Sequence, residues 1–273
     1  MAFRWLRLRK RVRQYLRYRQ ASPEALLLVA GCQRSGTSLI HHVLRLDLDT
    51  VTFDEISPLS TPDDPKKLRW RALAEVKTLI GAERSPLVVA KPLVESQQLD
   101  QLLDLHPHTR ALWMFRPFRD VARSNIKYFG RDNGHADLAP LLAGDTTDWR
   151  VQSMAAEDLQ AVKELYRPNL SAFDAAALFW FARNSLFFSR GFDREPRIRL
   201  CCYDDLVTRP QEVMRGVYAF IGRDYPGDGI LKDVFRDSRG KGKDVVLEDG
   251  VSALCQNLLD RLLASPRVSG PSA

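Results

Sequence analysis

The stretch ALLLVAGCQRSGTSLIHHVLRL at residues 25–46 decides the fold. It begins with an uninterrupted apolar run, the pattern of a strand that is buried on both faces. Small polar residues and two glycines follow, and apolar residues then recur at helical spacing from Leu39 to Leu46. The stretch therefore predicts a strand, a tight loop and a helix, in that order.

The predicted loop at residues 31–38 has the G-x-x-x-x-G frame of a nucleotide phosphate loop, from Gly31 to Gly36. Glycines let backbone N–H groups point into one concavity, and the following helix adds about half a positive charge at its N-terminus. Thr37 stands where a nucleoside triphosphatase carries a lysine for the β- and γ-phosphates. A glycine-containing turn with a helix cap is the alternative, but the flanking strand and helix favour phosphate binding.

Further along the chain, four short apolar runs have the length of buried parallel strands. They lie at residues 51–53, 87–90, 111–115 and 198–202. Segments with helical periodicity separate most of them, at residues 66–80, 96–105, 119–129, 153–166, 171–190, 209–222 and 251–263. This alternation predicts a single three-layer α/β domain with a central parallel sheet, which would bind its ligand beyond the carboxyl ends of the strands.

The predicted domain covers residues 21–265, and its margins differ from it in composition. Residues 1–20 are a basic arm in which Arg and Lys alternate with apolar residues at roughly helical spacing, which predicts an amphipathic helix. Residues 266–273 are expected to form a flexible tail. Inside the domain, residues 130–152 are rich in Gly, Asp and Thr, and we expect an irregular excursion there.

The chain has 273 residues, 45% of them hydrophobic, and a net charge of +7, much of which lies in the arm. Excess positive charge attracts an anionic ligand, nucleic acid or membrane phosphates. The sequence contains no apolar stretch typical of a signal peptide or a membrane span, and its four cysteines form neither a metal motif nor a disulfide framework. We therefore expect a soluble, cytoplasmic protein whose arm makes a peripheral membrane contact.

Two segments carry a resemblance to a known family. The first is Arg34-Ser35-Gly36-Thr37-Ser38, and the second is FRPFRDVARS, which places Ser124 eight residues after Arg116. Both resemble the P-loop sulfotransferase superfamily, and in particular its carbohydrate and tyrosyl-protein sulfotransferases. The resemblance implies an enzyme that transfers a sulfuryl group from 3′-phosphoadenosine-5′-phosphosulfate (PAPS) to a hydroxyl of a carbohydrate, glycolipid or peptide.

The resemblance also assigns residues to the donor site. Residues 34–38 would bind the 5′-phosphosulfate, and Arg116 with Ser124 the 3′-phosphate. A guanidinium at a strand end offers a planar fork of donors to such a dianion, although a salt bridge from Arg116 to Asp120 is an alternative. The remaining family-like residues are Tyr203, which would either contact the adenine or only pack at a strand end, and Arg239, Lys241 and Lys243 of a Gly/Lys loop.

Candidate catalytic residues follow the second and third predicted strands, where these relatives carry a carboxylate base and a lysine. Glu55 is the predicted general base, because the attacking hydroxyl must lose its proton to a nearby carboxylate or histidine. Lys91 and Arg34 are predicted to stabilise the charge that builds on the leaving oxygen. His41 and His42 are alternative bases, although their place inside a helix favours packing.

Two other classes of function stay open on the sequence alone. A P-loop kinase or nucleoside triphosphatase would require ATP and Mg²⁺, and the threonine at position 37 argues against it. A non-catalytic protein that binds a membrane surface or nucleic acid through the basic arm is the second, with nucleic acid the less favoured partner. No metal is expected, since no Asp-rich or His/Cys cluster predicts a site for one. Residues 130–170, with Trp149 and Tyr166, are expected to line the acceptor pocket.

Overall fold

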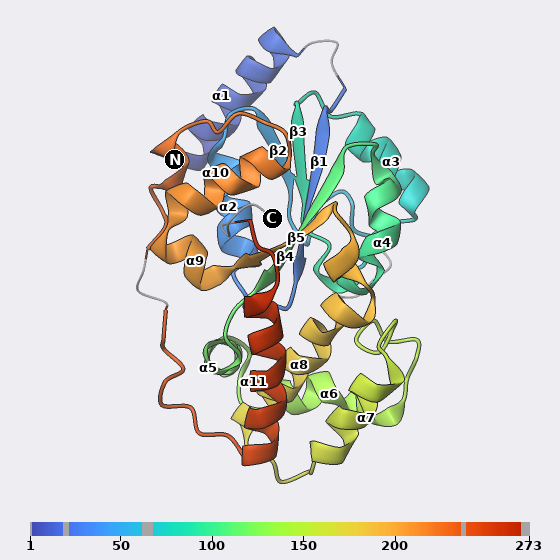
Figure 1. The fold of residues 1–273 in the computed structure, drawn as a ribbon. Coiled ribbons are helices and arrows are strands. Elements are labelled where there is room, and N and C mark those ends of the chain that lie inside the picture. Colours follow the sequence, from blue (N-terminus) through green and yellow to red (C-terminus); the bar gives the residue numbers. More distant parts are fainter. Residues whose placement is uncertain (1, 19–21, 62–67, 236–238, 269–273) are drawn as a thin grey trace.

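The computed structural model describes residues 2–18, 22–61, 68–235 and 239–268, and the strands in these ranges form one sheet. All five strands are parallel and lie in the order β2-β3-β1-β4-β5 (Figure 1). They are β1 (Ala25–Gly31), β2 (Thr50–Phe53), β3 (Leu87–Ala90), β4 (Thr109–Phe115) and β5 (Ile198–Cys202). The predicted α/β class with a central parallel sheet is confirmed.

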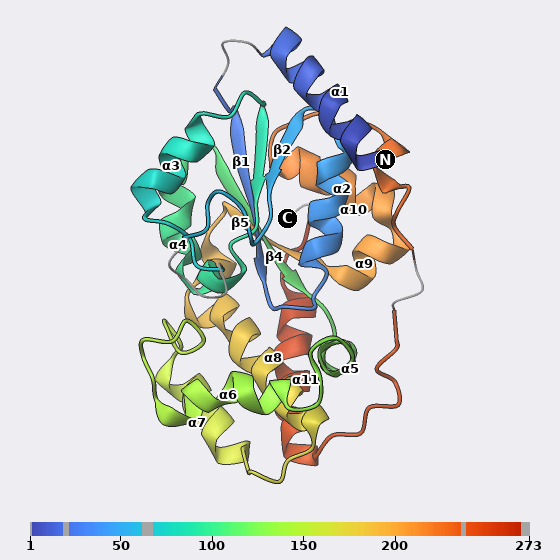
Figure 2. The same ribbon diagram turned by 180° about the vertical axis from the view of Figure 1, so that it is seen from behind.

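Helices cover both faces of the sheet, and β1 shows why. Leu26 and Leu28 of this fully buried strand belong to one hydrophobic core, and Leu27 and Val29 belong to the other. Successive side chains of a strand point to opposite faces, so one apolar run supplies two cores. The first core is covered by α3 (Leu73–Gly81) and α4 (Leu99–Leu102), and the second by α2 (Thr37–Leu46) and α10 (Pro210–Phe220) (Figure 2).

A second group of helices lies beyond the carboxyl ends of the strands, in the lower part of Figures 1 and 2. Its members are α5 (Phe118–Phe129), α6 (Asn133–Ala143), α7 (Ala156–Leu165), α8 (Ala172–Ser189) and α11 (Asp249–Ala264). α8 contacts the other four helices, and its residues from Asp174 to Phe187 are all buried. A helix that is apolar all round belongs in a core, so α8 organises the packing of this group.

The remaining elements in the described ranges are short, apart from the N-terminal helix. They are α1 (Ala2–Arg17), η1 (Leu93–Gln98), η2 (Leu103–Leu105), η3 (Phe192–Arg194), α9 (Tyr203–Thr208) and η4 (Asp228–Leu231). The helix predicted at residues 96–105 is therefore divided among η1, α4 and η2. The helix predicted at residues 66–80 begins only at Leu73, and residues 66 and 67 lie outside the described ranges. Of the described helices, none combines the length and the apolar composition needed to cross a bilayer.

The irregular excursion expected at residues 130–152 is wrong where α6 lies. Gly134 packs so closely on α8 that a Cβ there would lie 2.7 Å from the backbone nitrogen of Ala176. His135, Asp137 and Pro140 interrupt the apolar pattern of this segment, which hid the helix from a periodicity argument. Packing against α8, rather than an amphipathic pattern, therefore stabilises α6.

Both margins of the predicted domain contact it. The arm contains α1, which lies against the amino end of the sheet (Figure 1). At the other end of the chain, Arg267 pairs with Leu200 of β5, and the backbone N–H of Val268 donates to the Leu200 carbonyl at 3.0 Å. Residues 1, 19 and 20 of the arm and residues 269–273 of the predicted tail lie outside the described ranges.

Candidate active site

The carboxyl ends of the strands bring most of the sequence-predicted residues to one edge of the sheet. The loop at residues 31–38 follows β1, Asp54 and Glu55 follow β2, Lys91 follows β3, Arg116 follows β4, and Tyr203 follows β5. A crevice at this edge is where open parallel sheets bind their ligands. The five strand ends therefore define the candidate active site.

The backbone of the loop is left-handed at three positions. The φ angles of Gly31 and Gly36 are 119° and 93°, and that of Arg34 is 65°. A Cβ on Gly31 would lie 2.2 Å from the carbonyl oxygen of Met114, so β1 and β4 require glycine there. Left-handed backbone at a residue other than glycine costs about 1–3 kcal/mol and is concentrated at functional sites. The conformation of Arg34 therefore marks the tip of this loop.

Hydrogen-bond donors at the start of α2 suit an anion. Gly36 precedes this helix, and no side chain of the described residues caps its N-terminus. The hydroxyl of Ser35 is fully buried and has no hydrogen-bond partner in the described part of the chain. Buried hydroxyls without a partner are costly, so an anion that accepted from Ser35 and from the first helical amides would relieve that cost. This is the observation on which the phosphate-loop interpretation depends.

Lys91 connects the loop to the acidic pair that follows β2. Its side chain is 3% exposed, and the ammonium group donates to Ser38 Oγ at 2.9 Å and lies 2.8 Å from Glu55 Oε1. Asp54 is further away, at 3.5 Å, and is exposed. The loop itself contains threonine where nucleoside triphosphatases have a lysine, but the neighbouring strand brings a lysine to the same loop. The predicted residues Glu55 and Lys91 are thus direct neighbours.

Arg34 turns toward α5 and joins the two predicted phosphate motifs. Its Nε donates to Ser124 Oγ at 3.2 Å, and its guanidinium stacks on Tyr128 at 4.2 Å from the ring centroid. Burial lowers the pKa of the half-buried Arg34. The guanidinium therefore lies between the first loop and the helix that carries the second motif, and contacts a different part of the site from Lys91.

Arg116 forms the salt bridge that the sequence offered as an alternative. Its Nη2 lies 3.3 Å from Asp120 Oδ2, and both side chains are buried. Asp120 also accepts hydrogen bonds from the backbone N–H groups of Gly240 and Gly242. Gly242 packs so tightly on the start of α5 that a Cβ would lie 2.3 Å from the carbonyl carbon of Arg119. Asp120 thus holds the Gly/Lys loop beside Arg116, a connection that the sequence did not predict.

The other predicted donor residues surround this junction. Tyr203 is 7% exposed, and its ring lies 4.3 Å from the Arg116 guanidinium and against Gly36, where a Cβ would lie 2.4 Å from the ring. Arg239 lies 3.5 Å from Asp204, while Lys241 and Lys243 are exposed on the loop. Tyr203 therefore links the first loop to the second motif, and most of its ring surface is already covered by protein.

Neither histidine of α2 is placed to act as the general base. His41 is 3% exposed, its Nε2 faces the carbonyl oxygen of Phe53 at 3.1 Å, and burial lowers its pKa to about 4. His42 Nε2 contacts Asp233 Oδ2 at 2.8 Å, and Arg45 Nη2 lies 3.0 Å from its Nδ1, so both ring nitrogens are engaged. Burial likewise raises the pKa of the Cys32 thiol to about 12, so this cysteine of the loop is not a thiolate nucleophile at neutral pH. Of the two carboxylates beside Lys91, Glu55 is the nearer and is 30% exposed, and Asp54 is the more exposed.

The expected acceptor region reaches the loop through a polar cluster that sequence reasoning did not identify. Gln33 donates to Asp137 of α6 at 3.0 Å, and Asp137 pairs with Arg150 at 3.0 Å. The guanidinium of Arg183 stacks on Trp149, 4.8 Å from the centroid of the indole ring. Tyr166, by contrast, contacts His135 at 3.2 Å. The aspartates at positions 137 and 148 and the arginine at 150 are visible in the sequence, but the contact of Asp137 with Gln33 spans 104 residues and has no local signal.

No metal centre is assembled in the parts of the chain that the structure describes: they contain no group of three or more His, Cys, Asp or Glu side chains arranged to hold an ion.

One solved structure that resembles this chain is the sulfotransferase domain from the curacin biosynthetic pathway. The likeness covers 88% of this chain and 98% of that domain, with a TM-score of 0.55 and 13% sequence identity. No protein-family model and no curated protein matches the sequence. The likeness extends over nearly the whole chain, and it shows a sulfotransferase-like fold.

Proposed function

We propose that this chain is a sulfotransferase that uses PAPS as its donor and a hydroxyl group of a carbohydrate, glycolipid or peptide as its acceptor. The observation that carries the proposal is the contact between Arg34 and Ser124, because it unites the two predicted phosphate motifs in one site. A donor with phosphates at both its 5′ and 3′ positions needs two adjoining anion sites. The sulfotransferase-like fold supports the proposal independently of these residues.

The residues at the strand ends fit such a donor. The loop at 34–38, with the buried hydroxyl of Ser35 and the uncapped start of α2, would hold the 5′-phosphosulfate. Arg116, Ser124 and the loop that carries Arg239, Lys241 and Lys243 would hold the 3′-phosphate, since guanidinium and ammonium groups pair with phosphate oxygens. The ring of Tyr203, fixed against Gly36 and Arg116, would form the wall between the two.

The residues around Glu55 can perform an in-line transfer. The donor supplies an activated sulfuryl group; the new bond joins sulfur to the acceptor oxygen as the bond to the bridging oxygen breaks. Glu55 takes the proton of the attacking hydroxyl, a contribution of roughly 10²–10⁴-fold for a positioned base. Lys91, anchored on Ser38 and Glu55, places a fixed positive charge beside the loop where the negative charge of the leaving oxygen develops.

Binding and transfer assays with one matched pair of variants test this proposal. Arg110 lies near the amino end of β4 and Arg116 directly follows its carboxyl end, so Arg110→Ala controls for the loss of a guanidinium at the other end of the strand. Arg116→Ala should weaken the binding of adenosine 3′,5′-bisphosphate by about tenfold or more, because a hydrogen bond to a charged group contributes about 1.5–3 kcal/mol. Arg110→Ala should leave it nearly unchanged.

The activity itself is measured as transfer of labelled sulfate from PAPS to a panel of glycans, peptides and lipids. Transfer that persists in the presence of a chelator is expected. Binding of the bisphosphate no tighter than that of AMP would contradict the second phosphate site, and Mg²⁺-dependent turnover of ATP without sulfate transfer would replace the proposal by the kinase alternative.

A further inference from the structure

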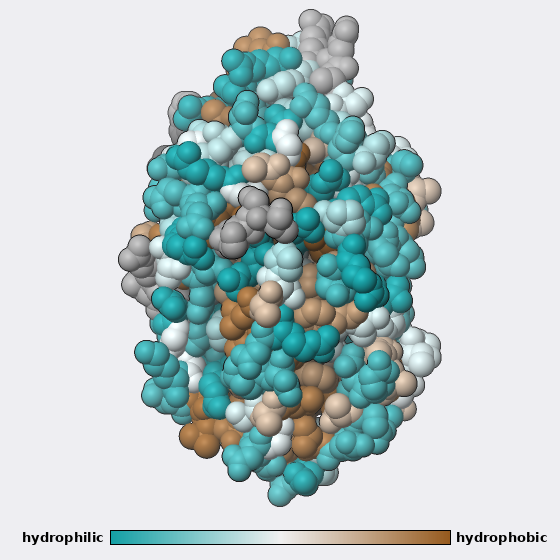
Figure 3. All heavy atoms as spheres, viewed as in Figure 1, coloured by the Kyte–Doolittle hydropathy of each residue, from teal (hydrophilic) through white to brown (hydrophobic). Residues whose placement is uncertain are grey.

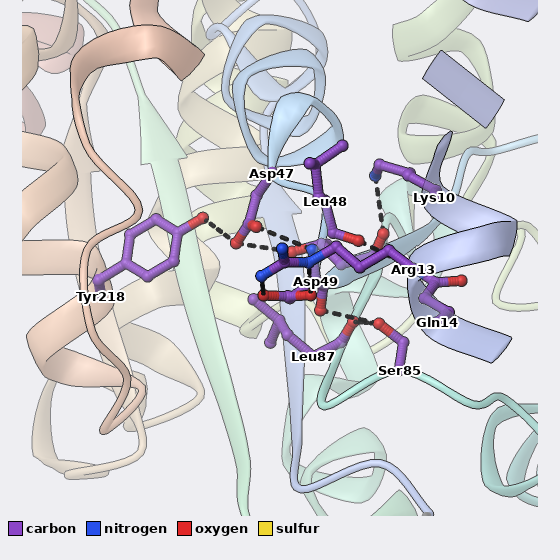
Figure 4. A network of polar contacts seen from close by, with 10 residues as sticks. Lys10, Arg13, Gln14, Asp47, Leu48, Asp49, Ser85, Leu87 and Tyr218 are labelled. Carbon is purple, nitrogen blue, oxygen red and sulfur yellow. Dashed lines mark hydrogen bonds and ion pairs between the residues drawn. The ribbon is translucent and has the colours of Figure 1, made fainter. Parts of the chain in front are cut away.

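The N-terminal helix α1 has an inner face that is fixed to the domain. Lys10 Nζ donates to the carbonyl oxygen of Thr50 at 2.7 Å, and Arg13 pairs with Asp49 through two contacts of 2.6 Å (Figure 4). Gln14 adds a donor to the Leu48 carbonyl at 3.4 Å. Arg13 and Gln14 come three and four residues after Lys10, a spacing that places all three side chains on one side of α1.

The turn that receives α1 is itself held in place. Asp47 accepts from the hydroxyls of Tyr218 at 2.8 Å and Thr50 at 3.2 Å, and Ser85 Oγ donates to the Asp49 carbonyl at 2.8 Å (Figure 4). The oxygen atoms that accept from α1 therefore belong to a turn that hydrogen bonds connect to α10 and to the segment before β3. A charged pair with bidentate geometry on such a turn gives α1 a defined orientation.

The outer face of α1 is apolar and exposed. Leu8, Val12, Tyr15 and Leu16 are 54%, 51%, 53% and 74% exposed, and their spacing places them on one stripe. In Figure 3 brown atoms lie beside teal ones at the outer end of this helix. Hollows of about 780 Å³ and 680 Å³ flank α1 on its two sides, which makes the helix a ridge at one extremity of the molecule.

Positive charge borders this stripe. Residues 2–17 contain seven Lys and Arg and no Asp or Glu. Arg9 and Arg11, both exposed, neighbour the stripe on opposite sides, since successive residues are turned by about 100° around a helix. The outer face thus combines an apolar centre with cationic margins, the pattern of a helix that lies in the plane of a membrane interface.

We infer that the outer face of α1 is a docking surface for an anionic lipid bilayer. Charge complementarity selects this occupant. Nucleic acid would neutralise the arginines but leave the apolar stripe in water, and a second copy of the chain would bring a second row of arginines against the first. A bilayer with acidic headgroups covers both parts at once, because the stripe enters the headgroup region while the arginines stay with the phosphates.

Sedimentation of the full chain with vesicles tests this inference. Vesicles of phosphatidylcholine with about one third phosphatidylserine should bind the protein, and vesicles of phosphatidylcholine alone should not. The combined change Leu8→Gln, Val12→Gln and Leu16→Gln should reduce binding by about tenfold or more, because it removes the inserted surface. Arg9→Gln with Arg11→Gln should reduce it by a similar factor at low salt.

Two control variants keep the result specific to α1. Leu73→Gln with Leu263→Gln removes exposed leucines elsewhere, and Lys77→Gln with Arg84→Gln removes the same charge from exposed positions in and just after α3. Both should bind vesicles as the unchanged chain does, and thermal unfolding should show that all variants fold. All of these substitutions lie outside the proposed donor site.

Three outcomes would overturn the inference. The first is vesicle binding that depends on Arg9 and Arg11 but not on the apolar stripe, which would indicate a charge-only surface of the nucleic-acid kind. The second is a dimer, detected by light scattering, that the apolar variant abolishes while vesicles do not bind. The third is a loss of vesicle binding that the control variants share.

Discussion

The two ends of the edge strand β2 use similar side chains for different purposes. At its start, Asp49 and the Thr50 carbonyl receive Arg13 and the buried Lys10. At its end, Glu55 receives the buried Lys91. Both ends therefore combine an acidic side chain with a buried lysine on an adjacent element, and composition alone does not distinguish them.

The difference lies in what else the lysine contacts. Lys10 donates to a backbone carbonyl, and its neighbours fix a helix in place. Lys91 donates to the hydroxyl of Ser38, in the loop that follows β1 at the carboxyl end of the sheet. The start of β2 is thus a structural joint, whereas its end faces the edge where parallel sheets bind ligands. Substitutions at the two ends should separate stability from transfer.

The largest effect is expected for Glu55→Gln. It keeps the size of the side chain and removes the group that takes the proton, so transfer should fall by roughly 10²–10⁴-fold while bisphosphate binding is retained. The control is Asp49→Asn, which removes a carboxylate from the other end of the same strand and should leave the transfer rate within a few-fold. Equal transfer rates for Glu55→Gln and the unchanged chain would show that another group is the base.

A smaller loss of about 10²–10³-fold is expected for Lys91→Met, in line with the removal of one fixed group that stabilises developing charge. Lys10→Met removes a lysine that is almost as buried, and it should change the transfer rate little. Steady-state rates with saturating acceptor measure both variants, and circular dichroism checks that they fold. If the two substitutions lowered the rate alike, the contrast between the ends of β2 would not hold.

The sequence predicted the five strands and the loop after β1 well, because each buried strand is a short apolar run and the loop has a distinctive frame. It also placed Glu55, Lys91 and Arg116 at strand ends, and strand ends of one parallel sheet meet at one edge. Side-chain partners could not be predicted in the same way. Asp120 holds Gly240 and Gly242 from 120 residues away, and no local pattern encodes such a contact.

Helix α6 shows the same limit for secondary structure. Its helical conformation depends on the close approach of Gly134 to α8, and this is a property of the assembled fold. The sequence therefore specified elements whose signal is periodic, and left out those whose stability comes from a partner that is distant along the chain.

The last two effects concern the pH dependence of stability and leave transfer unchanged, and they again compare the two ends of β2. His41 contacts the Phe53 carbonyl at the end of the strand, and burial lowers its pKa from 6.5 to about 4. Between these values the unfolded chain binds the proton more readily, so stability is fully present above pH 6.5 and falls as the pH falls toward 4, by up to about 3 kcal/mol. His41→Gln keeps a donor for the carbonyl and should flatten this part of the profile.

Lys10 at the start of β2 should act in a different window. Burial lowers its pKa from 10.5 to about 8, so the folded chain releases this proton first and stability should rise as the pH increases from 8 to 10.5. Lys10→Met should flatten only that alkaline rise, and His41→Gln only the acid fall. Urea unfolding of both variants across pH measures the two slopes. An acid slope that survives in His41→Gln would assign it to the carboxylates instead. An alkaline slope that survives in Lys10→Met would assign it to groups other than Lys10.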